Sequence, residues 1–459
     1  MSVVGPLDAM FLVGESREHP MHVGGLMVFD LPEGAGRDHL ARLYREMVDP
    51  GLAVNPMFGR RMRHSLGNLG YWSWQQDDEI DLEYHVRLSA LARPGRVREL
   101  FELTSRLHGT LLDRHRPLWE MHLIEGVQGR RFAVYSKVHH AMLDGVSALR
   151  WMQATLTDDP ARRHMPATYA LPSRKNDAAQ AESLVNAIAK AGGGIGRALT
   201  DLAGLTPTGL RGLAHTLRAE HAAVAFQAPK TIFNRPITGA RRFAAQSRPI
   251  ERLSAVRAST GATLNDVMLA MCAGALRNYL LDLNALPDKA LTAMVPVSIR
   301  GPGDTSEGGN SLATLWCDLA TDEPDPERRM RRVSESTKYA KGVLSQLTPL
   351  QNLMIGAFGL GSAGLGAVMP GVAGRTPPPY NLVISNVPGP VDETLYWNGA
   401  RLRGLYPASI VLNGQALNIS VTSYDQQLHF GLVGCRRSVP HLQRLLTHLE
   451  TSLTELERL

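Results

Sequence analysis

Two adjacent histidines, followed by an aspartate and a glycine, form the pattern in this sequence that is best suited to chemistry. His139 and His140 come directly after a strand-like stretch at 131–138, and Asp144 and Gly145 complete the heptapeptide HHAMLDG. A histidine at the end of a strand can direct its ring into a cleft, and its ordinary pKa of about 6.5 suits proton transfer near neutral pH. Asp144 can orient a ring or lock the loop, and Gly145 permits a turn into a following helix. The pattern therefore predicts a general base at this junction.

The paired histidines are also compatible with a metal site or with a purely structural role. A zinc site would need a third ligand, and HHAMLDG lacks the i, i+4 spacing on a helix that HExxH provides. Two buried histidines that only complete hydrogen bonds in a core are the simpler alternative. Cys272, Cys317 and Cys435 lie far apart without a CxxC pair, so we expect neither a metal site nor a disulfide framework.

Hydrophobic periodicity predicts the elements that position this motif. In the first part of the chain, residues 22–30 and 131–138 are strand-like, and residues 97–114 repeat apolar side chains at helical spacing. A second helix is expected to begin at Gly145. In the second half we expect a helix at 262–283 and strands at 291–299, 380–387, 408–412, 416–423 and 428–434. Helices and strands alternate without a strict βαβ rhythm, so the predicted fold class is α/β or α+β.

The length of the chain predicts two domains, because 459 residues exceed what one core usually organises. Hydrophobic residues make up 44% of the chain and charged residues 20%, which is ordinary for a globular protein and argues against disorder of the whole chain. Residues 173–231 are rich in alanine and glycine and are predicted to form a helical linker. The predicted domains are therefore residues 1–172 and residues 232–459.

The formal net charge of +6 makes the chain basic, and a basic balance can indicate nucleic acid, anionic lipid or a phosphorylated substrate as a partner. The arginines are scattered in short doublets without a long basic tract or interleaved aromatic residues, so nucleic acid is not expected. A membrane surface, the phosphate of a substrate and plain solvation account for the charge about equally well. For the doublet Arg241-Arg242 we weigh contact with substrate phosphates against a solvated surface, and we favour the surface.

Residues 342–374 contain no charged side chain. Their length would span a bilayer, which needs about 20 apolar residues, but polar residues, glycines and Pro370 interrupt the segment. We expect a buried or lipid-contacting helical pair here, and an ordinary core helix is the alternative. The first residues lack the pattern of a signal peptide. Together these features predict a cytoplasmic protein attached peripherally to the inner face of the plasma membrane or to a lipid droplet.

HHAMLDG resembles the HHxxxDG signature of the CoA-dependent acyltransferase superfamily, which includes chloramphenicol acetyltransferase and peptide-synthetase condensation domains. Within this superfamily the chain is most similar to the bacterial wax ester synthase/diacylglycerol acyltransferase family. The resemblance rests on the segments PLDAMFL (6–12), PMHVGGLMVFD (20–30), LLDRHRPLWEMHLIEG (111–126), GATLNDVMLA (261–270), VPVSIR (295–300), SNVPGP (385–390) and ALNISVTSYDQQLHFGLVGCR (416–436). HHxxxDG alone is moderately specific, and its combination with PLWE, NDV and SNVPGP is strong.

This resemblance implies two chloramphenicol-acetyltransferase-like domains side by side, with a tunnel at their interface. It also implies that His140 deprotonates an alcohol, whose oxygen attacks the thioester of acyl-CoA without a covalent enzyme intermediate. Acyl-CoA would be a co-substrate, no cofactor would be needed, and the acceptor would be diacylglycerol or a long-chain alcohol. Two alternatives stay open: acyl transfer to a glycolipid or polyketide alcohol, and a non-catalytic paralogue that binds lipid.

The family pattern suggests supporting roles for the remaining residues of the motif. His139 would support the loop, and direct catalysis by His139 is a weaker alternative. Asp144 would brace the loop through a cationic partner rather than relay a proton. The candidates for this partner are Arg60, Arg61 and Arg300.

Two further motifs carry candidate site residues. Asn265, followed by Asp266 in the second half, would supply a hydrogen-bond donor to the oxyanion, whereas capping of its helix accounts for this asparagine equally well. Glu120 of PLWE could shape the edge of the cleft. For this segment we favour a turn followed by a core tryptophan, Trp119.

Overall fold

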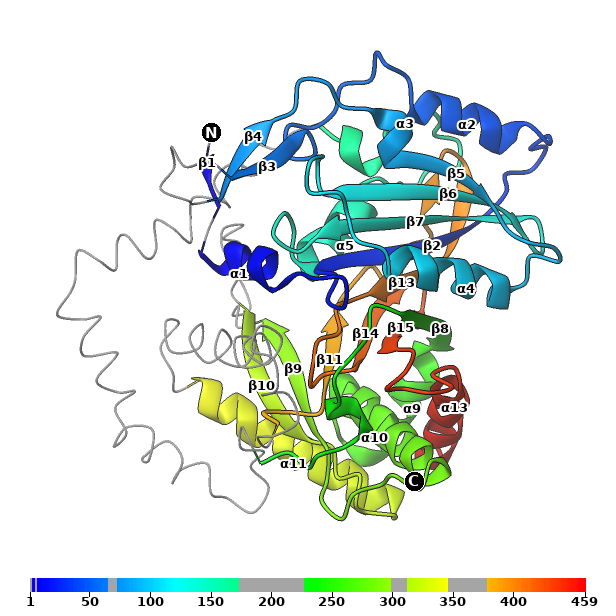
Figure 1. Ribbon diagram of the computed structural model, residues 1–459. Coiled ribbons are helices and arrows are strands. Elements are labelled where there is room, and N and C mark those ends of the chain that lie inside the picture. The colour runs from blue at the N-terminus through cyan, green and yellow to red at the C-terminus, as the bar shows by residue number, and fades with distance from the viewer. Residues whose placement is uncertain (1, 5, 65–71, 173–226, 299–311, 346–377) are drawn as a thin grey trace.

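Two six-stranded sheets form the body of the protein within the residues that the structure describes (Figure 1). The structure is a computed structural model and describes residues 2–4, 6–64, 72–172, 227–298, 312–345 and 378–459. Most of the predicted linker and most of the uncharged segment at 342–374 lie outside these ranges, as does Arg300. The fold is mixed α/β with two sheet-rich domains, as predicted.

The first sheet carries the motif on a central strand. Its strands in spatial order are β12 (Tyr396–Trp397), β13 (Ala400–Ala408), β2 (His22–Asp30), β7 (Arg131–His139), β6 (Trp119–Val127) and β5 (Val86–Ala90). β7 runs antiparallel to both β2 and β6. Because side chains alternate along a strand, Phe132 and Val134 enter one apolar core while Ala133 and Tyr135 enter the other. A strand buried on both faces gives the motif a rigid support.

The second sheet lies below the first in Figure 1 and is covered by the long helices of the C-terminal half. Its strands in order are β10 (Leu312–Asp318), β9 (Thr292–Ser298), β11 (Leu382–Val387), β14 (Leu417–Tyr424), β15 (Gln427–Cys435) and β8 (Arg241–Pro249). Its helices are α9 (Ile250–Thr260), α10 (Leu264–Asp282), α11 (Pro326–Ser345) and α13 (Arg444–Leu456). α10 is buried nearly all round, which fits its central place in the larger core.

Shorter elements surround the first sheet. A three-stranded sheet combines β1 (Ser2–Val3), β4 (Trp72–Gln76) and β3 (Arg60–His64). The helices on this side are α1 (Pro6–Gly14), α2 (His39–Met47), α3 (Leu82–His85), α4 (Val97–His108) and α5 (Gly145–Gln153), with short 3₁₀ turns at Thr168–Ala170 and, at the start of the second half, at Ile232–Asn234. α5 and the strands at 22–30 and 131–139 agree with the predictions from the sequence.

The two sheets do not come from separate halves of the chain. β13 pairs antiparallel with β2, from Leu402 opposite Phe29 to Ala408 opposite Gly24, so residues 396–408 complete the first sheet. β15 of the second sheet passes close beneath this strand: a Cβ at Gly431 would lie 1.8 Å from the carbonyl oxygen of Pro407. Only glycine permits this approach. The predicted domain 232–459 therefore contributes strands to both sheets, while its boundaries at 172 and 232 stay a prediction.

Two element predictions were wrong in their limits. The strand expected at 408–412 is instead β13 at 400–408, since Arg401 and Arg403 interrupt the hydrophobic pattern of a strand with one half-exposed face. The helix expected at 97–114 ends at His108, and the C-cap Gly109 stops it. Leu112 is buried beyond that helix in an irregular segment, which produces the apolar repeat that extended the prediction.

Candidate active site

The motif loop joins the end of β7 to the start of α5. Asp144 is the N-cap of α5, and its Oδ1 accepts a hydrogen bond from the Ser147 N–H at 2.7 Å. At the opposite end of the loop, the His140 N–H donates to the Met21 carbonyl oxygen at 2.8 Å. These bonds fix both ends of the loop to neighbouring elements, so the imidazole of His140 is held on a defined backbone.

Gly145 has a different role from the one predicted. It is the first residue of α5, its φ is not in the left-handed region, and a Cβ at this position would meet no atom within 4 Å. Neither the turn nor the packing in the described structure requires glycine here. The interpretation of Gly145 as the residue that permits the turn is therefore wrong.

His139 is fully buried beneath the loop. Its Nδ1 accepts a hydrogen bond from the Ala141 N–H at 3.1 Å, so in the neutral ring the proton lies on Nε2. That Nε2 is 3.4 Å from Oε1 of Glu15. Such contacts suit a residue that supports the loop, since Nδ1 bonds to the loop backbone and Nε2 is buried next to Glu15.

Glu15 is a part of the site that the sequence did not reveal. Its Oε2 accepts from the Arg114 Nε at 2.9 Å, and its Oε1 accepts from the Met21 N–H at 3.2 Å. Burial raises the pKa of Glu15, but the contacts with His139, Met21 and Arg114 outweigh burial and lower the pKa below its ordinary value. The carboxylate is therefore ionised at neutral pH. The sequence gives no signal that separates Glu15 from Glu18, the other acidic residue between α1 and β2.

His140 presents its ring differently from His139. The ring stacks on Phe11 of α1, with centroids 4.1 Å apart and planes 16° apart, and its nitrogens make no hydrogen bond with any other residue that the structure describes. Burial lowers the pKa of His140 to about 4, and the nearby Asp144 carboxylate opposes this shift only in part. The ring is therefore neutral at pH 7, and its free nitrogen can accept a proton.

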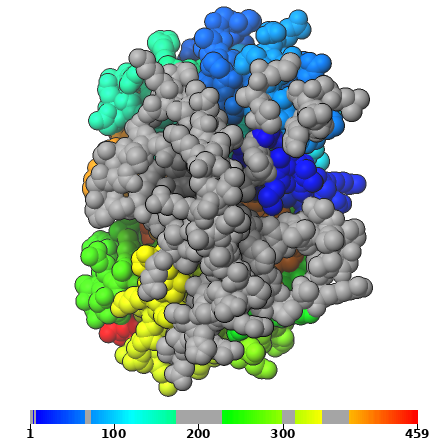
Figure 2. Space-filling model, turned by 90° about the vertical axis from the view of Figure 1, so that its left-hand side faces the viewer, coloured from blue at the N-terminus to red at the C-terminus, as the bar shows by residue number. Residues whose placement is uncertain are grey.

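The seam between the two domains passes beside this ring. Met21, which accepts the His140 N–H, packs in an apolar cluster with Met294 of β9 and Val383 of β11, and Phe11 packs against the same cluster. Figure 2 shows α1, in dark blue, at the surface between the first-domain residues above and the second-domain residues below. The base candidate therefore lies next to the junction of the two domains.

The cationic partner predicted for Asp144 is not found among the described residues, since neither Arg60 nor Arg61 forms an ion pair with it. Arg60 instead stacks on the Trp74 ring at 4.7 Å and lies near Asp8 of α1. Burial raises the pKa of Asp8 to about 6; Arg60 opposes the shift, and Asp144 adds to it. The loop is thus braced by helix capping, with Arg60 next to a second carboxyl group.

Asn265 is not the cap of its helix. Thr263 is the N-cap of α10 and exchanges hydrogen bonds with Asp266, whose carboxylate also accepts from the Thr337 hydroxyl at 2.6 Å. Asn265 Oδ1 instead accepts from Asn386 Nδ2 at 3.4 Å, which joins the NDV and SNVPGP segments. The capping interpretation is therefore wrong. Asp266 has a structural role, and a role of Asn265 at the oxyanion stays a prediction.

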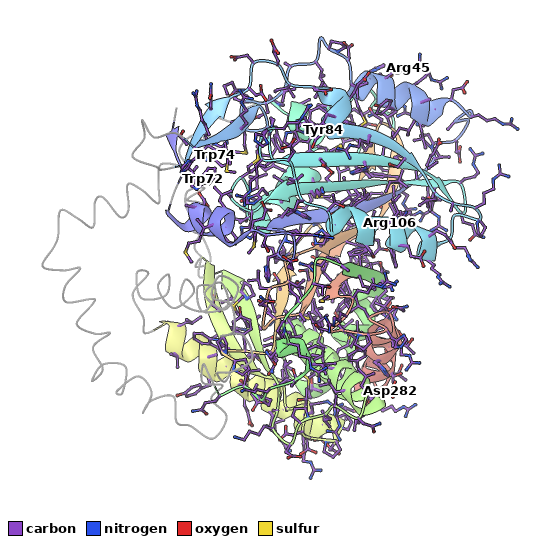
Figure 3. All side chains as sticks on the ribbon, in the orientation of Figure 1. Arg45, Trp72, Trp74, Tyr84, Arg106 and Asp282 are labelled. Carbon is purple, nitrogen blue, oxygen red and sulfur yellow. The ribbon has the colours of Figure 1, made fainter. Side chains whose placement is uncertain are left out.

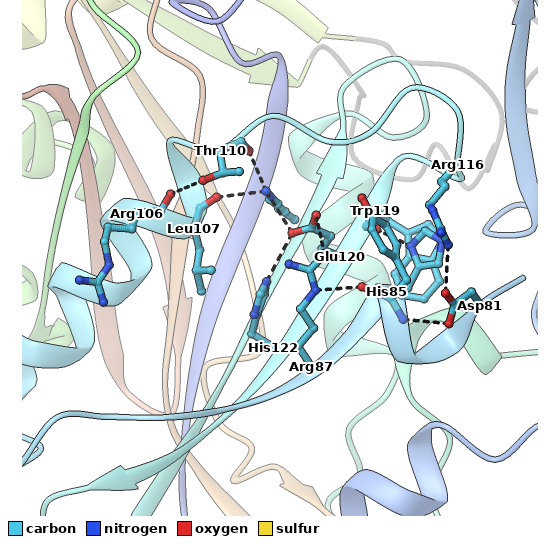
Figure 4. Close-up of polar contacts among 12 residues, drawn as sticks. Asp81, His85, Arg87, Arg106, Leu107, Thr110, Arg116, Trp119, Glu120 and His122 are labelled. Atoms are coloured by element: carbon cyan, nitrogen blue, oxygen red, sulfur yellow. Dashed lines mark hydrogen bonds and ion pairs between the residues drawn. The ribbon is translucent and has the colours of Figure 1, made fainter.

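Glu120 lies in a buried polar cluster (Figure 4). It is opposite Lys137 on neighbouring strands, and Lys137 Nζ is 3.2 Å from its Oε2. Lys137 also donates to the carbonyl oxygens of Leu107 and Thr110, at 3.1 Å and 2.7 Å. The core tryptophan predicted beside it is confirmed, because Trp119 is buried and donates to the Phe58 carbonyl oxygen at 2.8 Å. Neither the ion pair between Lys137 and Glu120 nor the hydrogen bonds from Lys137 to the end of α4 were predicted from the sequence.

Several histidines outside the motif are also buried. Burial lowers the pKa of His429 to about 4, while the bond to Tyr424 opposes the shift. His429 is satisfied as a neutral ring: its Nδ1 accepts from the Ser247 hydroxyl at 2.7 Å and its Nε2 donates to the Tyr424 carbonyl oxygen at 3.1 Å. Burial likewise lowers the pKa of His108 to about 4. The role of a hydrogen-bonded core histidine therefore applies to these rings, which do not touch the motif loop.

Because His429 and His108 are buried as neutral rings, we expect the free energy of unfolding to fall in acid. A group with a folded-state pKa near 4 and an unfolded-state pKa near 6.5 binds more protons when unfolded, so stability falls as the pH falls through this window. Between pH 7.5 and 5.5 we expect His429 to contribute about 1.4 kcal/mol of this loss. Urea unfolding at both pH values should show a smaller pH difference for His429→Asn than for the wild type. The exposed His164→Asn is the control, and an equal pH difference in all three proteins would contradict the prediction.

The described residues contain neither a metal-binding cluster nor a helix that could span a membrane. Among them, no group of three or more His, Cys, Asp or Glu side chains is placed to hold a metal ion, and the cysteines are free and buried. A search of the same residues finds no helix with the length and apolar character to cross a bilayer.

Comparison with known proteins decides the family. A model described as the wax ester synthase/diacylglycerol acyltransferase catalytic domain matches residues 4–268, and a model of the C-terminal domain of the same family matches residues 308–457. The chain belongs to the wax ester synthase/diacylglycerol acyltransferase family. The motifs HHAMLDG and PLWE lie within the catalytic match, as does Asn265.

Relatives in this family match over nearly the whole chain. A Mycobacterium tuberculosis protein named probable diacyglycerol O-acyltransferase tgs2 is 48% identical over 100% of this chain and 99% of its own length. The O-acyltransferase WSD of Acinetobacter baylyi is 40% identical, with 99% of this chain and 96% of that protein covered. Both names describe O-acyltransferases, which agrees with the enzyme class expected from the motif.

Solved structures support the fold of the family. The wax ester synthase/diacylglycerol acyltransferase from Marinobacter aquaeolei matches with a TM-score of 0.80 and 38% identity, covering 100% of this chain and 99% of that one. The first condensation domain of the calcium-dependent antibiotic synthetase matches with a TM-score of 0.57 and 17% identity, covering 100% and 95%. The second match concerns the fold alone, and it agrees with the predicted fold class. The interface tunnel stays a prediction.

Proposed function

We propose that this chain transfers an acyl group from acyl-CoA to the hydroxyl of diacylglycerol, forming triacylglycerol, with His140 as the general base. Long-chain fatty alcohols are proposed as a second class of acceptor, giving wax esters. The observation that carries the proposal is the state of His140: a neutral ring beside the domain seam with no protein partner for its nitrogens among the described residues. A second candidate function is not favoured by any contact in the described structure.

The proposed reaction is a direct transfer. A ring nitrogen of His140 removes the proton of the acceptor hydroxyl as its oxygen attacks the thioester carbonyl carbon. The tetrahedral intermediate collapses with cleavage of the C–S bond, and the CoA thiolate takes the proton from the imidazolium. The new ester keeps the acyl group, so atoms and charge balance without a cofactor. Such a base typically contributes about 10²–10⁴-fold, and alignment of two bound substrates contributes further.

Asn265 is proposed as a donor to the oxyanion of the intermediate. Its Oδ1 already accepts from Asn386, which orients the amide and leaves its Nδ2 for a ligand. Donors aimed at the developing charge are a large part of catalysis in acyl transfer. We assign supporting roles to His139, which lies beneath the loop, and to Asp144, which holds the loop as the N-cap of α5.

Parallel assays with different acceptors test the proposed function. The purified protein should be incubated with radiolabelled acyl-CoA and with diacylglycerol, a long-chain fatty alcohol, a glycolipid or a sugar alcohol. We expect label in triacylglycerol and in wax ester. Preferred labelling of the glycolipid would replace the proposal with the alternative acceptor class. Lipid binding without label in any product would indicate a non-catalytic paralogue.

We further propose that the protein works at a lipid surface on the cytoplasmic side, at the inner face of the plasma membrane or at a droplet. α1 exposes Met10 and Val13, at 47% and 64%, three residues apart and therefore on one helix face. Phe11 between them stacks on His140. A lipid surface in contact with α1 would deliver an apolar acceptor close to the base, and the net charge of +6 favours anionic lipid.

Replacing Met10 and Val13 by serine should weaken binding to vesicles of anionic phospholipid that contain diacylglycerol. Complete burial of such a side chain contributes about 1.5–3 kcal/mol, so partial insertion of both predicts about tenfold weaker binding. Leu281→Ser is the matched control, because Leu281 is 46% exposed and lies next to Asp282, far from α1 (Figure 3). Co-sedimentation with vesicles measures the effect, and equal binding of both variants would refute the role of α1.

A further inference from the structure

One short segment of the chain supports both histidines of the motif. We call residues 15–21, between α1 and β2, the support segment. At its start, Glu15 Oε1 lies 3.4 Å from His139 Nε2. At its end, the Met21 carbonyl oxygen accepts the His140 N–H at 2.8 Å. The Met21 N–H also donates to Glu15, so any shift of the segment moves the contacts to the His139 ring and to the His140 backbone together.

Two arginines, one from each domain, donate hydrogen bonds to the support segment. Arg114, which follows α4 in the first domain, donates to the Glu15 carboxylate at 2.9 Å and to the Leu12 carbonyl oxygen at 2.6 Å. Arg241, the first residue of β8 in the second domain, donates through Nη2 to the Glu18 carbonyl oxygen at 2.6 Å and through Nη1 to the Thr238 carbonyl oxygen. A residue of the second domain therefore bonds directly to the segment that contacts both histidines.

The surroundings of Arg241 are unusual for a cation. Arg241 is 6% exposed, so the prediction of a solvated surface is wrong for this residue. It forms no ion pair with any carboxylate in the described ranges. Burial lowers the pKa of Arg241 to about 10, although Cys435 opposes the shift. A buried cation without a counter-ion is destabilising unless its hydrogen bonds compensate. A forked guanidinium can reach two carbonyl groups on different segments, which an ammonium cannot do in the same geometry.

A close backbone contact supports the same junction independently. A Cβ at Gly239 would lie 2.5 Å from the carbonyl oxygen of Arg17, so only glycine lets the turn before β8 approach the support segment. The turn and the segment are therefore packed backbone to backbone, with Arg241 closing the contact. Arg242, the next residue of β8, is half-buried and makes no side-chain hydrogen bond or ion pair within the described parts of the chain.

We propose that Arg241 is a positioning residue through which the second domain holds the support segment, and with it Glu15 and His139, in the geometry that aligns His140. The inference rests on the proposed role of His140 as the base. Arg241 does not touch the reacting atoms. Its loss leaves the base chemically intact but poorly placed, so the chemical step suffers while binding of acyl-CoA does not.

Steady-state kinetics of Arg241→Met, Arg241→Lys and Arg242→Met test this role. Arg241→Met should lower kcat by about tenfold to a hundredfold, because small misplacements of a catalytic group have effects of this size. The KM for acyl-CoA should stay within about twofold of the wild type, as expected when only the transition state is affected. Arg241→Lys should recover part of kcat, and Arg242→Met should match the wild type. A raised KM for acyl-CoA with unchanged kcat would overturn the proposal and indicate a contact with CoA phosphates.

A double-variant comparison separates positioning from a general loss of structure. Glu15→Gln removes the carboxylate through which Arg241 is proposed to act, so Arg241→Met should reduce kcat little further in the Glu15→Gln protein. Multiplied losses in the double variant would overturn the proposed route through Glu15.

Hydrogen–deuterium exchange tests the same route without turnover. In Arg241→Met, peptides that cover residues 15–22 and 139–145 should exchange faster, because the Met21 and His140 amides lose their protection. Arg242→Met should leave them unchanged. Unchanged exchange in Arg241→Met would overturn the inference, whereas a wild-type protein that exchanges as expected but transfers no acyl group would count only against the proposed function.

Discussion

Replacing His140 by alanine is expected to lower kcat/KM for acyl transfer at least a hundredfold while the chain stays folded. The reason is the loss of the group that accepts the hydroxyl proton, which typically contributes about 10²–10⁴-fold. The ring makes no hydrogen bond with another described residue and only stacks on Phe11, so little structure depends on it. Label from acyl-CoA in triacylglycerol measures the effect. His164→Ala, at an exposed position, should match the wild type.

The pH dependence of the wild type checks the same assignment. Because burial lowers the pKa of His140 to about 4, the base stays unprotonated well below neutral pH. We expect kcat/KM to change less than about twofold between pH 7.5 and 5.5, whereas a histidine with the ordinary pKa would lose about tenfold. Activity of His140→Ala within tenfold of the wild type, or a wild-type fall centred near pH 6.5, would contradict the assignment.

Lys137→Met should be the most destabilising of the substitutions considered. It leaves Glu120 buried without its lysine partner and removes one hydrogen-bond donor from the carbonyl oxygens of Leu107 and Thr110. Breaking a buried ion pair by removing one partner typically lowers stability by about 3–5 kcal/mol. Urea unfolding followed by circular dichroism measures the free energy of unfolding. The half-exposed Arg87, 3.5 Å from Glu120, is too solvated to replace Lys137.

Two further variants test whether the lower stability of Lys137→Met comes from the unpaired buried charge of Glu120. In the double variant Glu120→Gln/Lys137→Met no buried charge is left unpaired, so it should be more stable than Lys137→Met alone. Arg98→Met breaks an exposed pair with Glu102 and should change stability by less than about 0.5 kcal/mol. A loss below about 1 kcal/mol for Lys137→Met would show that the buried pair contributes little.

The elements that carry the motif could be predicted from local patterns. The strand before His139, the helix that begins at Gly145 and the buried helix α10 each depend on the residues of one continuous stretch. Periodicity reports burial along such a stretch, so it predicts which residues form an element and which faces are covered. The family resemblance added the pairing of these elements into two domains, which the fold confirms.

The partners of the site could not be predicted in this way. Glu15 meets His139, and Lys137 meets Glu120, through contacts between strands or between a loop and a strand. Arg241 reaches Glu18 across 223 positions of the chain. Nothing in the type or spacing of these residues distinguishes them from solvated charges. Their buried contacts arise only when the sheets pack.

The sequence by itself therefore indicated the chemistry proposed for His140 and determined the strand–loop–helix unit that presents it, because these depend on residues close together in the chain. The tertiary structure alone decided three things: that β13 from the second half completes the first sheet, that Asp144 is the N-cap of α5 and pairs with no arginine among the described residues, and that Arg241 of the second domain bonds to the segment beneath the histidines. In each case, residues far apart in the sequence become neighbours when the apolar faces of the sheets and helices pack together. The pattern of residues along the chain does not show which distant residues will meet.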